Sequence, residues 1–317
     1  MLAPIRMNPA YRCGLATPWG GSRLSSVYGK NIPDPRTGEA LALSAIPGLN
    51  SVTDEGETLS ARIEKHGGKL VGTAVKGEFP LLLKLLDADD ALSVQVHPGD
   101  EYARRVEGKY GKTEAWVILK AEPGAQLVFG VVPGTTTEQL REASAQGSAV
   151  QALLQRVDVE PGDVLYIPSG MVHAIGKGIM LYEIQQSSDV TYRFYDWDRV
   201  DQAGRKRELH LDKALDVTDV TLPAVKAVPQ VMQNDAAGVR SLLLKNDFFG
   251  LERLEKCNGM EIAPTPEKFG IITAIEDGCI VWDGGEMTLK AGQTAMLPAD
   301  GYTLKVSGGH FLLTYPM

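Results

Sequence analysis

At 317 residues the sequence is long enough to bury a substantial core, and its length corresponds to roughly two domains. Its formal net charge of −8 excludes general binding to nucleic acid or to a membrane surface, because both need a positive field. No apolar run reaches the length of a membrane span, and Cys13, Cys257 and Cys279 show no CxxC spacing. Together with a start that lacks a signal-peptide core, these features predict a cytoplasmic protein.

The first part of the chain predicts little regular structure. Residues 1–50 are rich in Gly and Pro, which favours irregular segments with short strands. A helix is expected from about Thr58, because Leu59 and Ile63 are four residues apart and Gly67 and Gly68 follow as a stop.

The middle of the chain predicts one short strand after another. A helix is expected only at 136–154, and residues 205–220 predict a basic start, a strand-like ELHL and a helical turn. Beyond Pro223 the strand pattern resumes, over 239–256 and 269–317. Many short strands with turn signals indicate closed or sandwiched antiparallel sheets. The strands expected between 79 and 200 are FPLLLKLL, ALSVQVH, EAWVILKA, QLVFGVV, DVLYIPSG, HAIGKG, IMLYEIQQ and VTYRFYDW.

A weak internal repeat relates the two parts. The segments 160–170 and 290–300 both place a Gly turn before a strand that ends at a Pro-led turn. Two copies predict two similar β-barrels. His173 follows the first copy, whereas the corresponding place after the second copy has Tyr302 or Leu304 and no histidine, so we expect only the first barrel to bind a metal.

The strand Ser93–Pro98 presents possible metal ligands. Its period-two alternation puts Gln95 and His97 on one face. Glu114 opens another expected strand, where it shares a face with Trp116, and His173 follows a tight turn. Each residue alone is more often structural. Together, two imidazoles, a carboxylate and an amide oxygen suit zinc, although two His and one carboxylate also suit Fe(II).

Two cationic residues lie in apolar or aromatic strands. Lys84 interrupts FPLLLKLL, so it either serves an anion or faces outward at a strand edge. Arg193 lies among aromatic residues, and it is either positioned for a ligand or paired with Asp189, Asp196 or Asp198.

Four segments together resemble the type I mannose-6-phosphate isomerases in their shorter bacterial form. They are FPLLLKLLDADDALSVQVHP, GKTEAW, PGDVLYIPSGMVHAIGKG and LYEIQQSSDVTYRFYDWDR. The resemblance covers most of residues 15–217 and implies a mainly β fold of two cupin-like (jelly-roll) barrels with a few short helices. We expect a catalytic cupin domain with an N-terminal extension over 1–222, and a C-terminal cupin-like domain without metal ligands over 223–317.

The resemblance also implies an activity and its residues. The family uses one zinc ion to interconvert mannose 6-phosphate and fructose 6-phosphate, so a sugar phosphate is the expected small-molecule partner. Proton transfer through an enediol requires a base, for which Glu183, Lys112 or a zinc-bound water is available, and a group that stabilises the oxyanion. The implied metal ligands are Gln95, His97, Glu114 and His173; the implied catalytic residues are Arg193, Lys112 and Glu183; and the implied phosphate contacts are Lys84 and Ser93.

Two functions of other classes remain open. One is a cupin dioxygenase with Fe(II) on the same ligands, against which Lys84 and Arg193 argue, because most such substrates need no phosphate pocket. The other is a non-catalytic sugar-phosphate-binding protein, against which the intact set of ligands argues. The sequence leaves the oligomeric state open.

Overall fold

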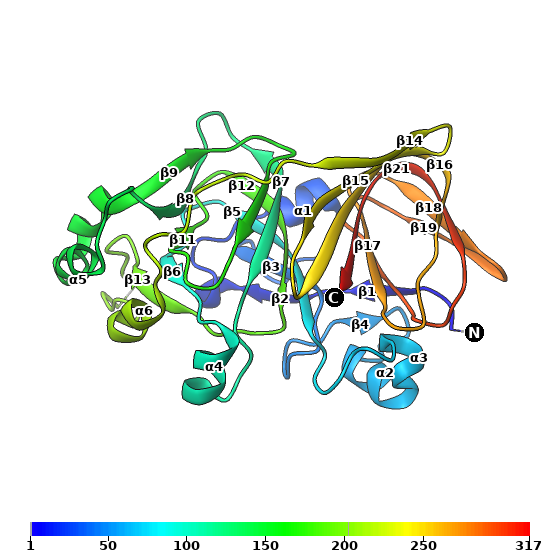
Figure 1. Cartoon of the computed structure of the whole chain (residues 1–317), viewed down its shortest axis with the longest axis horizontal. Coiled ribbons are helices and arrows are strands. Elements are labelled where there is room, and N and C mark those ends of the chain that lie inside the picture. Colours follow the sequence, from blue (N-terminus) through cyan, green and yellow to red (C-terminus); the bar gives the residue numbers. More distant parts are fainter. Residues whose placement is uncertain (1, 202) are drawn as a thin grey trace.

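The structure is a computed structural model that describes residues 2–201 and 203–317, and within them the protein is mainly β (Figure 1). Two sheets occupy one half of the molecule, and a third, larger sheet occupies the other half. In the described part of the chain, no helix is both long and apolar enough to cross a membrane.

Antiparallel pairing joins the strands of all three sheets. The six-stranded sheet has, in spatial order, β10 (Val164–Ile167), β7 (Glu114–Ala121), β12 (Ile179–Gln186), β5 (Leu81–Ala88), β3 (Thr37–Leu43) and β2 (Ala10–Cys13). The five-stranded sheet has β13 (Tyr192–Tyr195), β6 (Val94–Val96), β11 (His173–Ala174), β8 (Gln126–Val131) and β9 (Leu154–Asp158). The ten-stranded sheet has β14 (Gln230–Asp235), β15 (Gly238–Lys245), β16 (Phe249–Ile262), β21 (Leu304–Pro316), β17 (Gly270–Ala274), β20 (Thr294–Leu297), β1 (Ile5–Asn8) and β4 (Val52–Thr53), and β18 (Gly278–Trp282) and β19 (Gly285–Leu289) extend from β21.

Short helices connect or flank these strands. They are α1 (Arg23–Tyr28), α2 (Leu59–His66), α3 (Gly68–Val71), α4 (Asp100–Glu107), α5 (Thr137–Ala145) and α6 (Leu211–Val217), with 3-10 turns η1 (Gly14–Ala16) and η2 (Gly147–Leu153).

The helix expected from Thr58 is confirmed, and the Thr58 side chain caps α2 by accepting a hydrogen bond from the backbone N–H of Ala61. The prediction that Gly67 and Gly68 stop this helix is only partly right, because Gly67 ends α2 but Gly68 begins the next helix, α3. The helix expected over 136–154 divides into α5 and η2, and Gly147, at a φ of 66°, begins the second piece.

Two other expectations need correction, and two helices were not expected. The strand-like ELHL is not a strand, because the backbone N–H of His210 bonds to the carbonyl of Arg193 and α6 begins at the next residue. HAIGKG contributes only the two residues of β11. Helices α1 and α4 were not predicted from the sequence.

The internal repeat has a structural counterpart. Gly162 and Gly292 both have positive φ, at 96° and 80°, which a side chain would strain. Strands β10 and β20 each begin two residues later, at Val164 and Thr294. The first copy lies in the six-stranded sheet and the second in the ten-stranded sheet. In the ten-stranded sheet, β20 also pairs with β1 from the start of the described chain.

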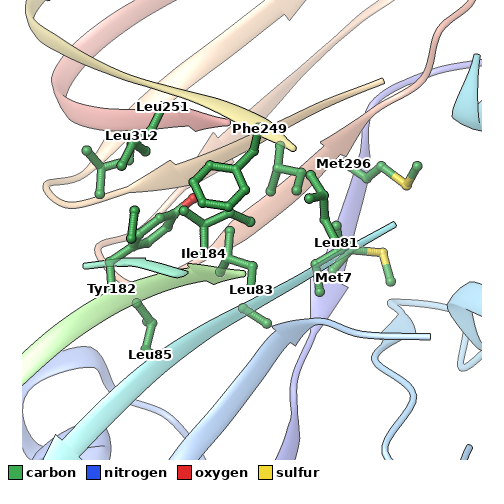
Figure 2. Close-up of a cluster of buried hydrophobic side chains, with 14 of the residues drawn as sticks. Met7, Leu81, Leu83, Leu85, Tyr182, Ile184, Phe249, Leu251, Met296 and Leu312 are labelled. Carbon is green, nitrogen blue, oxygen red and sulfur yellow. The ribbon is translucent and has the colours of Figure 1, made fainter. Parts of the chain in front are cut away.

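One hydrophobic core joins the six-stranded and ten-stranded sheets (Figure 2). Leu83 and Ile184 from the first sheet pack in the same cluster as Phe249 and Leu312 from the second. The Tyr182 hydroxyl lies 2.7 Å from the Thr314 hydroxyl across this contact. The large sheet therefore supports the back of the strands that carry the site described next.

Candidate metal centre and active-site pocket

Three ligating side chains meet between the two smaller sheets. His97 follows β6, His173 opens β11, and Glu114 opens β7. Strands β6 and β11 are neighbours, with His173 opposite Gln95, whereas Glu114 comes from the six-stranded sheet. The ligating atoms of these three side chains lie within 4.8 Å of one another, and all three residues are buried. The site therefore contains side chains from both the five-stranded and the six-stranded sheet.

Each imidazole is fixed with one nitrogen toward the centre. His97 Nδ1 donates to the carbonyl of Val190 at 3.0 Å, and His173 Nδ1 donates to the carbonyl of Met171 at 2.9 Å. Since a carbonyl only accepts, each Nε2 keeps its lone pair, at 3.4 Å and 3.8 Å from the Glu114 carboxylate. Burial lowers the pKa of His97 to about 3 and also lowers the pKa of His173, so both rings are neutral, as metal ligands must be.

The carboxylate of Glu114 has unmet hydrogen-bonding capacity. Within the described part of the chain, neither of its oxygens accepts a hydrogen bond, and His97 Nε2 also lacks a hydrogen-bond partner. Lys112 Nζ lies 2.7 Å from Glu114 Oε1 as an ion pair. Burial raises the pKa of Glu114, but Lys112 together with His97 and His173 outweighs that effect, and the pKa falls well below its ordinary value. The lone pairs of two neutral imidazoles and a carboxylate converge in this buried site, and such a set of donor atoms fits a divalent cation.

Gln95 lies beside this group. Its amide nitrogen is 3.4 Å from His173 Nε2, and the assignment of amide nitrogen and oxygen can be exchanged by a flip. The oxygen is therefore within reach of the same centre.

A cavity of about 280 Å³ lies beside this group, and it is lined by Lys112, which pairs with Glu114, and by Gln95, which lies next to His173. Its lining brings together every remaining site residue expected from the sequence, and adds charged residues from β2, β3 and the segments before and after β13. The expected residues are Lys84, Ser93, Gln95, Lys112, Glu183 and Arg193, and the added ones are Arg12, Glu39, Asp189 and Arg207.

Lys84 is buried and faces two carboxylates. Its Nζ lies 2.8 Å from Glu183 Oε1 and 3.7 Å from Glu39 Oε1, so it does not face outward at a strand edge. Glu183 Oε2 accepts a hydrogen bond from Trp116 Nε1 at 3.1 Å. Burial and the charge of Glu114 raise the pKa of Glu183, although Lys84 offsets part of the rise.

Arg193 has no carboxylate partner among the residues that were candidates for one. Asp189 pairs with Lys109 at 2.7 Å, Asp196 with Arg207, and Asp198 with Lys206 at 2.9 Å. Arg193 instead donates to the Ser93 hydroxyl at 3.2 Å and to the carbonyl of Glu208 at 2.6 Å. The guanidinium therefore brings a largely uncompensated positive charge to the cavity.

Sequence reasoning missed Glu39, Arg12 and Arg207 as lining residues. Lys84 gave the one available signal, because a lysine in an apolar strand needs an anion. The sequence does not say that β3 pairs with β5, which is the pairing that brings Glu39 to Lys84.

Comparisons with known proteins agree with this geometry. The family model described as phosphomannose isomerase type I, catalytic domain, matches residues 12–118. The chain is 38% identical over 283 residues to a mannose-6-phosphate isomerase of Streptococcus mutans, which covers 88% of each chain. It is 39% identical over 312 residues to the mannose-6-phosphate isomerase ManA of Bacillus subtilis, which covers 96% of each. The chain belongs to the mannose-6-phosphate isomerase family.

The fold agrees with this membership. The crystal structure of a mannose 6-phosphate isomerase from Bacillus subtilis superimposes with a TM-score of 0.91 at 33% identity over the whole of both chains. The resemblance inferred from the four sequence segments is confirmed, as is the expectation of an isomerase. The family model ends before His173, Glu183 and Arg193, so the roles of these residues rest on their geometry.

Proposed function

We propose that the protein interconverts mannose 6-phosphate and fructose 6-phosphate through an enediol, with one zinc ion per chain. The observation that carries the proposal is the buried group of His97, Glu114 and His173, with its unmet lone pairs, beside a cavity rich in charged side chains. Family membership supports the substrate pair.

His97, Glu114 and His173 would hold the zinc, with the Gln95 oxygen as a fourth ligand. Neutral imidazoles and a carboxylate are ligands that zinc prefers. A bound zinc ion supplies a Lewis acid that makes the hydrogen next to a sugar carbonyl easier to remove. Trp116 supports this arrangement, since its ring packs edge-on against His173 while its N–H bonds to Glu183.

The chain's own side chains supply charge stabilisation and proton transfer. Arg193 and Lys112 stabilise the negative charge that develops on the sugar oxygens. Glu183 and Lys112 are the two side chains placed to carry a proton between C1 and C2. The raised pKa of Glu183 favours that residue, because a base works best when its pKa approaches the working pH.

Ser93 and Lys84 are the proposed contacts of the phosphate. Ser93 lies beside the Arg193 guanidinium, which carries charge available to an anion. Lys84 Nζ lies 2.8 Å from Glu183 Oε1, so part of its charge is already compensated. We infer that Lys84 holds Glu183 in place and contributes less to phosphate binding than an unpaired lysine would.

The proposal includes the architecture of two cupin-like barrels, over 1–222 and 223–317. The repeated turn and strand at β10 and β20 supports it. Strands β1 and β4 would then complete the second barrel from the N-terminal part of the chain. A cytoplasmic location stays a prediction from the sequence.

A coupled assay with fructose 6-phosphate, combined with elemental analysis of the purified protein, tests the function. We expect turnover and about one zinc per chain. His173→Ala should lose both, whereas His66→Ala, the same substitution on α2 away from the cavity, should keep both. Iron in place of zinc together with no turnover would contradict the proposal, and a fully metallated His173→Ala protein would refute the ligand assignment.

A further inference from the structure

A second cavity lies in the ten-stranded sheet, outside the site described above. Its volume is about 390 Å³, and none of the proposed metal, catalytic or phosphate-binding residues lines it. Four apolar side chains and five polar ones define what we name the C-terminal cavity. They are Ile262, Phe269, Leu297 and Leu313, and Arg240, Glu252, Lys268, Thr303 and Tyr315.

A buried carboxylate at this cavity is fully satisfied by its neighbours. Glu252 is 2% exposed, and its oxygens accept hydrogen bonds from Arg240 Nε at 2.6 Å and from the Tyr315 hydroxyl at 2.9 Å. Burial and the charge of Glu252 raise the pKa of Tyr315 to about 12, so the hydroxyl remains a donor. The charge of Glu252 is therefore balanced by Arg240, and Arg240 keeps its terminal N–H groups for another acceptor.

The position of the Tyr315 ring is built into the sheet. Gly250 lies opposite Tyr315 in the pairing of β16 and β21. A Cβ at Gly250 would lie 2.4 Å from Tyr315 Cε2, so only glycine lets the ring lie across the neighbouring strand. A rigid aromatic face beside a cavity lowers the entropic cost of binding a ligand.

The side chain of Lys268 brings to this cavity a positive charge that no neighbouring carboxylate pairs with. Its Nζ lies 5.5 Å from the centre of the Tyr315 ring, and no described carboxylate lies within 4.0 Å of it. Glu261 also lines the cavity, and its carboxylate already pairs with Lys305 at 3.7 Å. The loop that carries Lys268 is anchored, because the N–H groups of Thr73 and Ala74 donate to its backbone carbonyls.

We propose that the C-terminal cavity binds a small organic anion. Its phosphate or carboxylate group would meet Lys268 and the free N–H groups of Arg240, and its carbon skeleton would lie against Tyr315 and the apolar wall formed by Leu297 and Leu313. This assigns a ligand-binding role to the C-terminal sheet that is independent of the isomerase reaction.

Calorimetric titration with phenyl phosphate and with benzoate tests the proposal and distinguishes the two acidic groups. We expect saturable binding of at least one probe to the intact protein. Lys268→Ala should raise Kd about tenfold, the effect of losing one charge-assisted contact. Lys290→Ala, the same substitution at an exposed lysine outside the lining, should leave Kd unchanged.

Two further measurements keep this cavity separate from the active site. An Arg193→Ala protein should bind the probe as the wild type does, and Lys268→Ala should keep the turnover of fructose 6-phosphate. Binding lost in Arg193→Ala and kept in Lys268→Ala would place the probe in the active site and overturn the proposal. Absence of saturable binding of both probes would overturn it as well.

Discussion

Glu183 combines two roles at the scale of a single residue, since it pairs with Lys84 and lines the cavity next to the metal ligands. A raised pKa means that the base form appears only above that raised value, so turnover should fall as the pH decreases through it. Lys84→Met removes the cation that favours the charged form, and should therefore move the acidic limb of the kcat/KM profile to higher pH. A limb that stays in place would indicate that Lys112, and not Glu183, is the base.

Arg193 is the residue whose loss should reduce turnover most without loss of metal. Its guanidinium pairs with no carboxylate of the described residues and is held by Ser93 and the carbonyl of Glu208, so it can stabilise developing negative charge. Arg193→Ala should lower kcat about 10²-fold to 10³-fold, the usual cost of removing a preorganised donor. Zinc content should stay unchanged. Arg205→Ala, at an exposed arginine paired with Asp201, serves as the matched control, and unchanged turnover in Arg193→Ala would refute the assigned role.

Residue patterns predicted which side chains share a face, but not which strands are neighbours. Alternation put Gln95 and His97 on one face, and both indeed lie beside His173. It also put Glu114 and Trp116 together, and Trp116 contacts His173 while Glu114 lies near it. The sequence did not predict Glu39 as a site residue, because its position depends on the pairing of β3 with β5. That contact joins segments distant in sequence, and no local pattern encodes it.

At the scale of elements, the capping box of α5 makes the clearest prediction. The Thr136 hydroxyl accepts from the backbone of Gln139, and the Gln139 side chain accepts from the backbone of Thr136. Thr136→Ala should destabilise α5 by about 1 kcal/mol, so its amides should exchange several-fold faster in hydrogen-exchange measurements. Thr137→Ala, the same change one residue later, should leave exchange nearly unaltered; equal effects of both variants would contradict the capping role.

Elements with a strong local signal were predicted from sequence, and those fixed by contacts were not. Thr58 and Thr136 cap helices that were expected. Helix α4 is short and mostly charged, so its pattern had little apolar periodicity to reveal it. In ELHL, alternation suggested a strand, but His210 joins β13 through hydrogen bonds to the backbone of Arg193 and the chain then turns into α6.

At the scale of the whole molecule, the core shared by two sheets should make them lose structure together. Phe249 is fully buried in the cluster that also contains Leu83 and Ile184. Phe249→Ala should cost about 3–5 kcal/mol and speed hydrogen exchange in both β12 and β16. Phe311→Ala, in a cluster made only by the C-terminal part, should mainly affect the ten-stranded sheet. Faster exchange confined to β16 in Phe249→Ala would show that the sheets are energetically independent.

Because β1 pairs with β20, β1 cannot complete its place in the large sheet until β20 has been synthesised. Ile5 lies opposite Met296, so β1 waits for a partner that is synthesised about 290 residues later. At about 5–20 residues per second, that wait is roughly 15–60 s. During this interval β1 can pair with β4, but its other edge, which pairs with β20 in the folded protein, stays open, and a chaperone bound to this segment would protect it until β20 has been made.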